Sequence, residues 1–370
     1  MKRILQTALS PGDVITLTAA VRDLKTAYPH RLTLDGRTRF PDLWLGNPHI
    51  SPLSAEDPEV ETIECGYPLV HQSNRLPVHF VSGYLEFLND RLGLRARPAA
   101  FHGDLHLTSK EQGRWPAALN ALPEGVPYWL LVAGGKYDFT TKWWARSRYQ
   151  EVVDALWGRV LFVRLGARDD FHPPLRGVFD LVGRTSLRDC IQLCHHAQGV
   201  VCPLAALMLM IAATPDLEGR RGARPAVVLA GGREPAHWVS YPGHHVLHSI
   251  GALPCCATEA CWRSRVVPLG DGTAFDQAGQ LCLDVVGALP RCMDRIEATE
   301  VVGRIEAALS AHRAATHSAA SWASVAPLLT QRDPQSPDAL LERYRRRDNE
   351  TALDPVSRTF PPEPLSPTLK

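Results

Sequence analysis

The stretch RILQTALSPGDVITLTAAVRDLKTAYP, residues 3–29, decides the expected fold. Residues 3–9 form a short apolar run typical of a strand, and SPGD at 10–13 is a turn signal. The apolar residues of 14–29 then recur at helical spacing. A strand, a turn and a helix in this order predict the first βα unit of a parallel sheet covered by helices.

The same alternation continues along the chain. Strands are predicted at 31–35 and near 60–65, with a helix over 78–94, and the pattern restarts after NALPEGVP at 120–127. Further strands are predicted at 128–134, 160–166, 179–183, 199–203 and 226–232, and helices at 146–156, 186–197 and 204–213. The expected class is α/β, with two Rossmann-like lobes facing a cleft.

The expected boundaries follow from composition. An N-terminal lobe is predicted over residues 1–120 and a C-terminal lobe over 121–311. Residues 312–370 are rich in Pro, Ser and Ala, which predicts a largely disordered tail with one short helix at 337–349.

Composition limits the class of function. Forty Lys and Arg residues against 39 Asp and Glu give a net charge of +1, so we expect no nucleic-acid partner. The N-terminus lacks a signal-peptide core, and the longest apolar run, 200–213, is shorter than the roughly 20 residues that span a bilayer. A soluble cytoplasmic protein without an integral membrane segment is therefore predicted.

The nine cysteines are expected to be thiols or metal ligands, since the cytoplasm keeps thiols reduced. Cys256, Cys261, Cys282 and Cys292 lie in two neighbouring segments, with Cys255 as a spare. Four thiolates are what a closed tetrahedral site requires, so we predict a structural metal, zinc or iron. A redox-active group and simple clustering of thiols are the alternatives.

Several residues stand where α/β folds place ligand-binding loops. Asp13 follows the first strand and is either a catalytic base or a cap of the following helix. Gly134 and Gly135 would let the backbone approach a ligand closely. Gly231 and Gly232 form a second pair of this kind, directly before Arg233 and Glu234. Lys142 is either a phosphate ligand at a helix start or a surface lysine.

These motifs, taken in order, resemble glycosyltransferase family 9, the ADP-heptose-dependent heptosyltransferases. The likeness runs over roughly residues 1–300 and rests on Ser10, Gly12 and Asp13 and on the phrases at 24–29, 46–48, 134–144, 180–202 and, more loosely, 231–238. It implies a GT-B fold, a bacterial-type enzyme and inverting transfer of a sugar from a nucleotide diphosphate donor. In that reaction a carboxylate deprotonates the acceptor hydroxyl while cations and helix N-termini stabilise the departing diphosphate.

The resemblance also implies roles. Asp13 matches the catalytic base and Lys142 the donor-phosphate lysine. The remaining residues of the expected donor site are Ser10, Gly12, Gly134, Gly135, Lys136, Thr140, Thr141, Arg233 and Glu234.

One segment departs from the family pattern. The family carries an acidic residue, Ser or Thr, and Gly followed shortly by His, but this chain has apolar residues at 203–206 and Leu209 at the His position. The donor is then held differently, is not ADP-heptose, or is used poorly. A four-cysteine iron site also occurs in the autotransporter heptosyltransferases, a protein-modifying branch of the family.

The partners are predicted only in part. The donor is a nucleotide sugar, ADP-heptose or a relative, and the acceptor is left open among a glycan, a natural product and a protein or peptide. His71, Gln72, Asn74 and Asp104 are the acceptor-site candidates. A homo-oligomer is compatible with the sequence. The alternative functions are a non-catalytic binding or scaffold protein of the same fold and a GT-B nucleotide-sugar epimerase.

Overall fold

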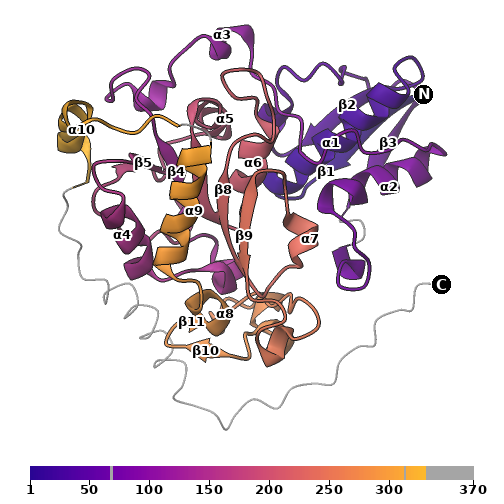
Figure 1. Cartoon of the computed structure of the whole chain (residues 1–370). Coiled ribbons are helices and arrows are strands. Elements are labelled where there is room, and N and C mark those ends of the chain that lie inside the picture. The colour runs from indigo at the N-terminus through magenta and orange to yellow at the C-terminus, as the bar shows by residue number, and fades with distance from the viewer. Residues whose placement is uncertain (67–69, 312–313, 331–370) are drawn as a thin grey trace.

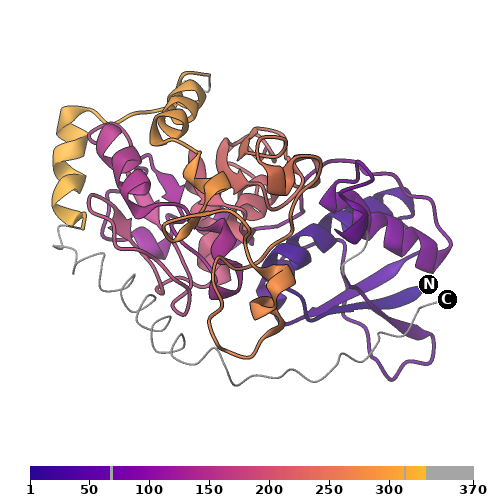
Figure 2. The ribbon, with the colours of Figure 1, turned by 90° about the horizontal axis from the view of Figure 1, so that it is seen from below.

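The computed structural model describes residues 1–66, 70–311 and 314–330 and consists of two α/β lobes side by side (Figures 1 and 2). The N-terminal lobe contains a parallel sheet in the order β2-β1-β3. Its elements are β1 (Lys2–Thr7), α1 (Pro11–Ala27), β2 (Thr33–Thr38), β3 (Val60–Glu64), α2 (Phe80–Leu92) and α3 (Ser109–Gln112). The predicted opening βα unit is confirmed, and the first three strands and the helix α2 lie within a few residues of their predicted ranges.

The C-terminal lobe is built on a larger parallel sheet in the order β6-β5-β4-β7-β8-β9. Its elements are β4 (Trp129–Leu131), α4 (Arg146–Ala155), β5 (Phe162–Arg164), β6 (Phe179–Asp180), α5 (Leu187–His196), β7 (Gly199–Pro203), α6 (Ala206–Ala213), β8 (Ala226–Gly231), α7 (Ala236–Val239) and β9 (His244–His248). The strands β4, β7 and β8 are buried throughout, as expected of a parallel sheet covered on both faces.

Several shorter elements follow the large sheet. They are β10 (Val285–Val286), β11 (Leu289–Pro290), α8 (Arg291–Asp294), α9 (Ala298–Ala311) and α10 (Ala319–Val325). In the described part of the chain, none of the helices combines the length and the apolar character needed to cross a membrane.

Helix α1 starts where the sequence predicts it. Ser10 is the N-cap and Pro11 occupies the first turn. Residues of the first turn do not need an N–H for the hydrogen bonds of the helix, so proline is tolerated there. Most of α1 is buried, because α2 packs on it within the N-terminal lobe and α6 packs on it from the C-terminal lobe (Figure 1). The lobes therefore meet along a helix pair at the carboxyl end of β1.

Residues 255–292, which we call the cysteine-rich insert, lie beyond the carboxyl ends of β8 and β9 (Figure 1). Arg265 anchors this insert, since its fully buried guanidinium pairs with Asp138, Asp271 and Asp276. A buried cation of this kind needs several anionic partners to offset its desolvation. The insert is thus folded around a charged centre and is attached to the loop that follows β4.

The expected disorder of the tail does not extend to residues 314–330. Trp322, Val325 and Leu329 are buried against the C-terminal lobe, and His317 Nε2 lies 2.9 Å from the carbonyl oxygen of Pro127. The few apolar residues of this Ala- and Ser-rich segment are spaced so that they face the lobe. Composition alone does not indicate this spacing. The helix predicted at 337–349 lies outside the described residues.

Candidate functional site

Asp13 lies at the carboxyl end of β1, in the first turn of α1. Its Oδ2 accepts hydrogen bonds from the backbone N–H of Ser10 at 2.9 Å and from the Ser10 hydroxyl at 2.6 Å. These bonds form a capping box between the N-cap and the third helical residue. Asp13 therefore caps α1, which is one of its two predicted roles. The same bonds fix its carboxylate at the junction of the lobes, and its role as a base stays a prediction.

An apolar segment of the C-terminal lobe covers the Asp13 turn. A Cβ placed on Gly12 would lie 3.1 Å from Cδ1 of Leu209, and Asp13 itself is 1% exposed. Helix α6 is buried along nearly its whole length, as expected for a helix that is apolar on every face. Leu209, at the position of the family's histidine, thus packs against the turn that carries the expected base.

Lys142 lies at the end of the loop after β4 and faces the same junction. Its Nζ is 2.7 Å from Oε1 of Glu234 and donates a hydrogen bond of 3.2 Å to the carbonyl oxygen of Leu204. Burial lowers the pKa of Lys142 from its usual value, while the negative charges of Glu234 and Asp13 oppose that shift. The lysine is therefore a partly buried cation and not a surface residue.

Arg233 and Glu234 complete a charged group that follows β8. The Arg233 guanidinium pairs with Glu234 and lies 4.7 Å from the ring centre of Phe139. Burial alone would raise the pKa of Glu234, but the charges of Lys142 and Arg233 outweigh it and hold that pKa below its usual value. The structure thus brings together Lys142, Arg233 and Glu234, as the donor-site prediction requires.

The two glycines after β4 meet the protein's own backbone. A Cβ on Gly134, whose φ is +96°, would lie 2.0 Å from the carbonyl oxygen of Phe171. Gly135 exchanges two backbone hydrogen bonds with Phe171, at 2.8 and 3.0 Å. Close packing of the Phe171 segment therefore accounts for both glycines, and their contact with a donor stays a prediction. Lys136 is exposed and its charge opposes the rise that burial causes in the pKa of Asp170, while its contact with a donor stays a prediction.

The two threonines before Lys142 are buried and already hydrogen-bonded. Thr140 Oγ1 accepts a bond of 2.8 Å from the N–H of Val266. Thr141 Oγ1 donates to the carbonyl oxygens of Arg263 at 2.8 Å and Ser264 at 3.0 Å. Both hydroxyls hold the cysteine-rich insert, so the predicted hydrogen bonds from these side chains to a phosphate would require exchange of partners.

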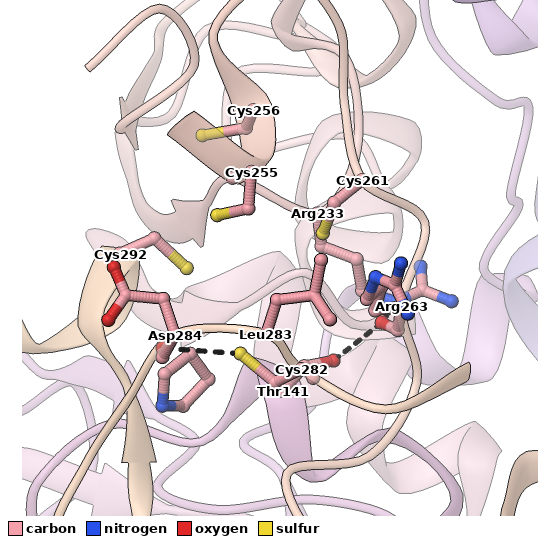
Figure 3. Close-up of a pocket in the computed structure, with 12 residues that line it drawn as sticks. Thr141, Arg233, Cys255, Cys256, Cys261, Arg263, Cys282, Leu283, Asp284 and Cys292 are labelled. Atoms are coloured by element: carbon pink, nitrogen blue, oxygen red, sulfur yellow. Dashed lines mark hydrogen bonds between the residues drawn. The ribbon is translucent and has the colours of Figure 1, made fainter. Parts of the chain in front are cut away.

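All five cysteines of the insert line one pocket, together with Thr141 and Arg233 (Figure 3). The sulfurs of Cys255, Cys261, Cys282 and Cys292 point into a common space, whereas that of Cys256 points away from it. Cys256 Sγ donates a hydrogen bond of 3.3 Å to the carbonyl oxygen of Ser249. The spacing predicted the cluster, but it gave no basis for choosing between the adjacent Cys255 and Cys256.

The nine cysteines are free thiols. Burial raises the pKa of Cys261 and Cys282, and raises that of Cys292 to about 12. Within the described ranges, no three His, Cys, Asp or Glu side chains are arranged so as to hold a metal ion. The structure therefore confirms that the cysteines of the insert cluster, and metal binding stays a prediction.

Two acceptor-site candidates have structural partners. Asn74 donates from Nδ2 to the carbonyl oxygen of Ala260 at 2.9 Å and accepts at Oδ1 from the Ala260 N–H at 3.2 Å. Asp104 is buried, with His106 Nε2 at 2.9 Å and the Arg221 guanidinium at 3.5 Å. Asn74 thus connects the N-terminal lobe to the insert, and Asp104 lies between the lobes.

Sequence reasoning missed the aromatic residues around Arg233. The guanidinium lies 5.6 Å from the ring centre of Trp262, on the side of the insert, as well as near Phe139. Trp262 has a φ of 51°, a left-handed conformation that a bulky side chain rarely adopts. In the sequence, these aromatic residues stand next to a cysteine and next to the Thr-Thr-Lys motif. Aromatic residues are too common at such positions to predict a contact with Arg233.

The fold and site define a two-lobed α/β protein whose charged side chains converge at strand ends where the lobes meet. No protein-family model matches the sequence, and no curated protein matches it. Among solved structures, the chain is similar to a glycosyl transferase family 9 protein from Veillonella parvula, with 14% identity, 84% of this chain and 97% of that chain covered, and a TM-score of 0.53. It is similar to ADP-heptose LPS heptosyltransferase II of E. coli, with 15% identity, 85% and 100% coverage, and a TM-score of 0.52.

A third similar structure is TibC of enterotoxigenic E. coli, described as a bacterial iron-containing dodecameric glycosyltransferase. Identity is 18%, coverage is 84% of this chain and 76% of that chain, and the TM-score is 0.56. The resemblance to glycosyltransferase family 9 is therefore confirmed for the fold, which is that of the heptosyltransferases.

Proposed function

We propose that this chain is an inverting glycosyltransferase that moves a heptose or related sugar from a nucleotide diphosphate donor, with ADP-heptose favoured, to an acceptor hydroxyl. The observation that carries the proposal is the convergence of Asp13 with the group of Lys142, Arg233 and Glu234 at the lobe junction. They follow β1, β4 and β8, at the carboxyl ends where parallel sheets bind ligands. The fold shared with the heptosyltransferases supports the reaction class.

In the proposed reaction Asp13 takes the proton of the acceptor hydroxyl as its oxygen attacks the anomeric carbon of the donor. The bond between that carbon and the diphosphate oxygen breaks, so the configuration inverts and the nucleotide diphosphate leaves. The hydrogen bonds from Ser10 hold the carboxylate in one orientation for this step.

Lys142 and Arg233 supply positive charge for the leaving diphosphate. Glu234 neutralises part of that charge in the free protein, which keeps two buried cations compatible with the fold. When the diphosphate binds, its oxygens compete with Glu234 for Lys142. The Glu234 carboxylate, still paired with Arg233, could then accept a hydrogen bond from a hydroxyl group of the donor.

Access to Asp13 requires movement of the lobes. Asp13 is 1% exposed beneath Leu209, so the acceptor hydroxyl reaches it only after α6 moves away from the start of α1. Hinged closure around a substrate is common in two-lobed enzymes. The contact of Leu209 with the turn at Gly12 would have to open before the acceptor binds.

We further propose that the cysteine-rich insert binds one zinc or iron ion through Cys255, Cys261, Cys282 and Cys292. Their sulfurs point into one space, and thiolate ligands suit both metals. Cys255 replaces Cys256 in the predicted set, because the Cys256 sulfur is directed at Ser249. A metal with four protein ligands has no open position, so its part would be structural.

The test is an assay of purified protein with ADP-heptose, other nucleotide sugars and panels of glycan, peptide and small-molecule acceptors. Release of ADP together with a glycosylated product, identified by mass spectrometry, is the expected result. Isomerised donor without transfer would identify an epimerase, and nucleotide binding without turnover a binding protein. If no nucleotide or nucleotide sugar binds, the proposed function is wrong. Because TibC is described as dodecameric, light scattering of the same sample should look for an oligomer.

A further inference from the structure

The loop that carries Lys142 is tied to the cysteine-rich insert by several hydrogen bonds. Thr141 is the point of attachment: its hydroxyl proton is shared between the carbonyl oxygens of Arg263 and Ser264, as Figure 3 shows for the Arg263 bond. The Thr141 N–H donates to the same Ser264 oxygen at 3.2 Å. Thr141 is 4% exposed, so water does not replace these bonds.

The same short segment of the insert also holds the other half of the charged group. The N–H groups of Cys261 and Trp262 donate to the carbonyl oxygens of Gly232 and Arg233, at 3.1 and 3.0 Å. Arg233 Nε donates back to the carbonyl oxygen of Arg263 at 2.8 Å. Residues 261–264 therefore form a bridge between the loop after β4 and the loop after β8.

The cysteine cluster lies at the other side of this bridge. Cβ atoms placed on Gly231 and Gly232 would lie 3.1 Å from Cys292 Sγ and 2.9 Å from Cys256 Sγ. The loop after β8 therefore packs directly against the cysteine cluster. Trp262, held at a φ of 51° directly after Cys261, shows that the surrounding bonds impose the path of the bridge.

We propose that Thr141 is a positioning residue that couples the cysteine-rich insert to Lys142, so that the conformation of residues 261–264 sets the affinity of the Lys142 site for a nucleotide diphosphate. Thr141 acts through Lys142 and through Arg263 and need not touch the ligand. The inference rests on the proposed function, because it takes Lys142 as the diphosphate ligand.

Coupling between two sites is reciprocal, so the inference can be measured from either side. Loosening the insert should weaken nucleotide binding, and a bound nucleotide should make the insert more rigid. A hydroxyl that only stabilised the fold would change the melting temperature but would not link these two properties.

The experiment compares Thr141→Val, which keeps the shape and removes the hydroxyl, with Thr141→Ser, which restores it. Thr26→Val is the matched control, since the Thr26 hydroxyl also bonds a backbone carbonyl, that of Arg22, at an exposed and remote position. ADP affinity is measured by calorimetry on full-length protein. Thr141→Val should bind ADP about tenfold more weakly, and Thr141→Ser and Thr26→Val should stay near the original affinity.

Hydrogen exchange of the unmutated chain provides the second measurement and does not depend on any variant folding. ADP should slow exchange of the amides at 261–266, and Thr141→Val without ADP should speed it. Unchanged ADP affinity in Thr141→Val, or exchange at 261–266 that ignores ADP in the unmutated chain, would overturn the inference while leaving the proposed function standing. Failure of the unmutated chain to bind ADP or any nucleotide sugar would overturn both.

Discussion

Nζ of Lys142 lies 2.7 Å from Oε1 of Glu234, and this ion pair joins the loop after β4 to the loop after β8. Arg233 shares the same carboxylate, so the group consists of two cations and one anion and carries one net positive charge. A partly buried site with this balance attracts an anion without leaving an unpaired cation when empty. Under the proposed function, we expect a diphosphate to bind by replacing the Glu234 carboxylate as the partner of Lys142.

The first prediction concerns Asp13 as base. Asp13→Asn keeps an oxygen that accepts from Ser10 but has no basic carboxylate, so turnover should fall by about 10²–10⁴ while ADP binding stays. The matched control is Asp189→Asn, because Asp189 holds the same capping-box position in α5, accepting from Ser186 at 2.8 and 2.7 Å. Equal turnover in both variants would remove Asp13 from the mechanism and leave it as a cap.

The second prediction concerns Lys142. Lys142→Met removes the ammonium group and leaves Arg233 paired with Glu234, so the chain should still fold. Loss of a charged hydrogen bond to the diphosphate should weaken ADP binding roughly tenfold to a hundredfold by calorimetry. Lys110→Met, at an exposed lysine of α3, is the control and should bind as before. Equal losses in the two variants would indicate a general charge effect.

The third prediction concerns metal binding. Chain purified without added metal should contain about one equivalent of zinc or iron, since a tetrahedral thiolate site holds a single ion. Cys261→Ser and Cys255→Ser should each lose the metal and lower the melting temperature, because binding free energy in such sites is folding free energy. Cys256→Ser should retain it, since that sulfur bonds Ser249. Metal retained in Cys255→Ser but lost in Cys256→Ser would restore the ligand set predicted from the spacing.

The fourth prediction concerns pH and His244. Burial, together with His245 and His79, lowers the pKa of His244 from 6.5 to about 3, and neither ring nitrogen has a hydrogen-bond partner among the described residues. Between pH 6.5 and pH 3 the unfolded chain binds a proton at His244 that the folded chain does not bind. The free energy of unfolding is therefore highest, as far as His244 is concerned, above pH 6.5, and it falls as the pH drops toward 3. At pH 5 the loss attributable to His244 should be about 2 kcal/mol.

Urea denaturation at pH 7.5 and pH 5.0 measures this effect. His244→Leu should reduce the difference in unfolding free energy between the two pH values, because the variant has no group to protonate at that position. His248→Leu, on the exposed end of the same strand, is the control and should keep the original difference. If both variants show the full loss at pH 5.0, other groups are responsible.

Much of the fold could be predicted because periodicity is a local property. The alternation of strand and helix placed β1, α1 and the buried strands β4, β7 and β8 near their observed ranges. The same reasoning failed for residues 314–330, where Ala and Ser suggested disorder but Trp322 and Val325 pack on the lobe. Burial of a few apolar residues by a distant surface leaves little trace in composition.

The candidate site could be predicted only as a set of residue types. Sequence reasoning identified Asp13, Lys142, Arg233 and Glu234 and predicted that they share a site, since loops at the carboxyl ends of parallel strands meet. It predicted that the hydroxyls of Thr140 and Thr141 bond a phosphate; in the structure both bond the cysteine-rich insert, and their contact with a ligand stays a prediction. It could not show that the space beside Gly134 holds the Phe171 carbonyl, and the contact of Gly134 with a donor stays a prediction.

The sequence by itself determined the two α/β lobes, the turn that carries Asp13 and the gathering of five cysteines between 255 and 292, because each is encoded by neighbouring residues. Only the tertiary structure decided which cysteine faces away, which partner each hydroxyl takes and that Leu209 covers the Asp13 turn. Those outcomes depend on the direction of individual bonds between segments far apart in the chain. Hydrogen bonds and close packing are specific to distance and angle, and no local pattern records them.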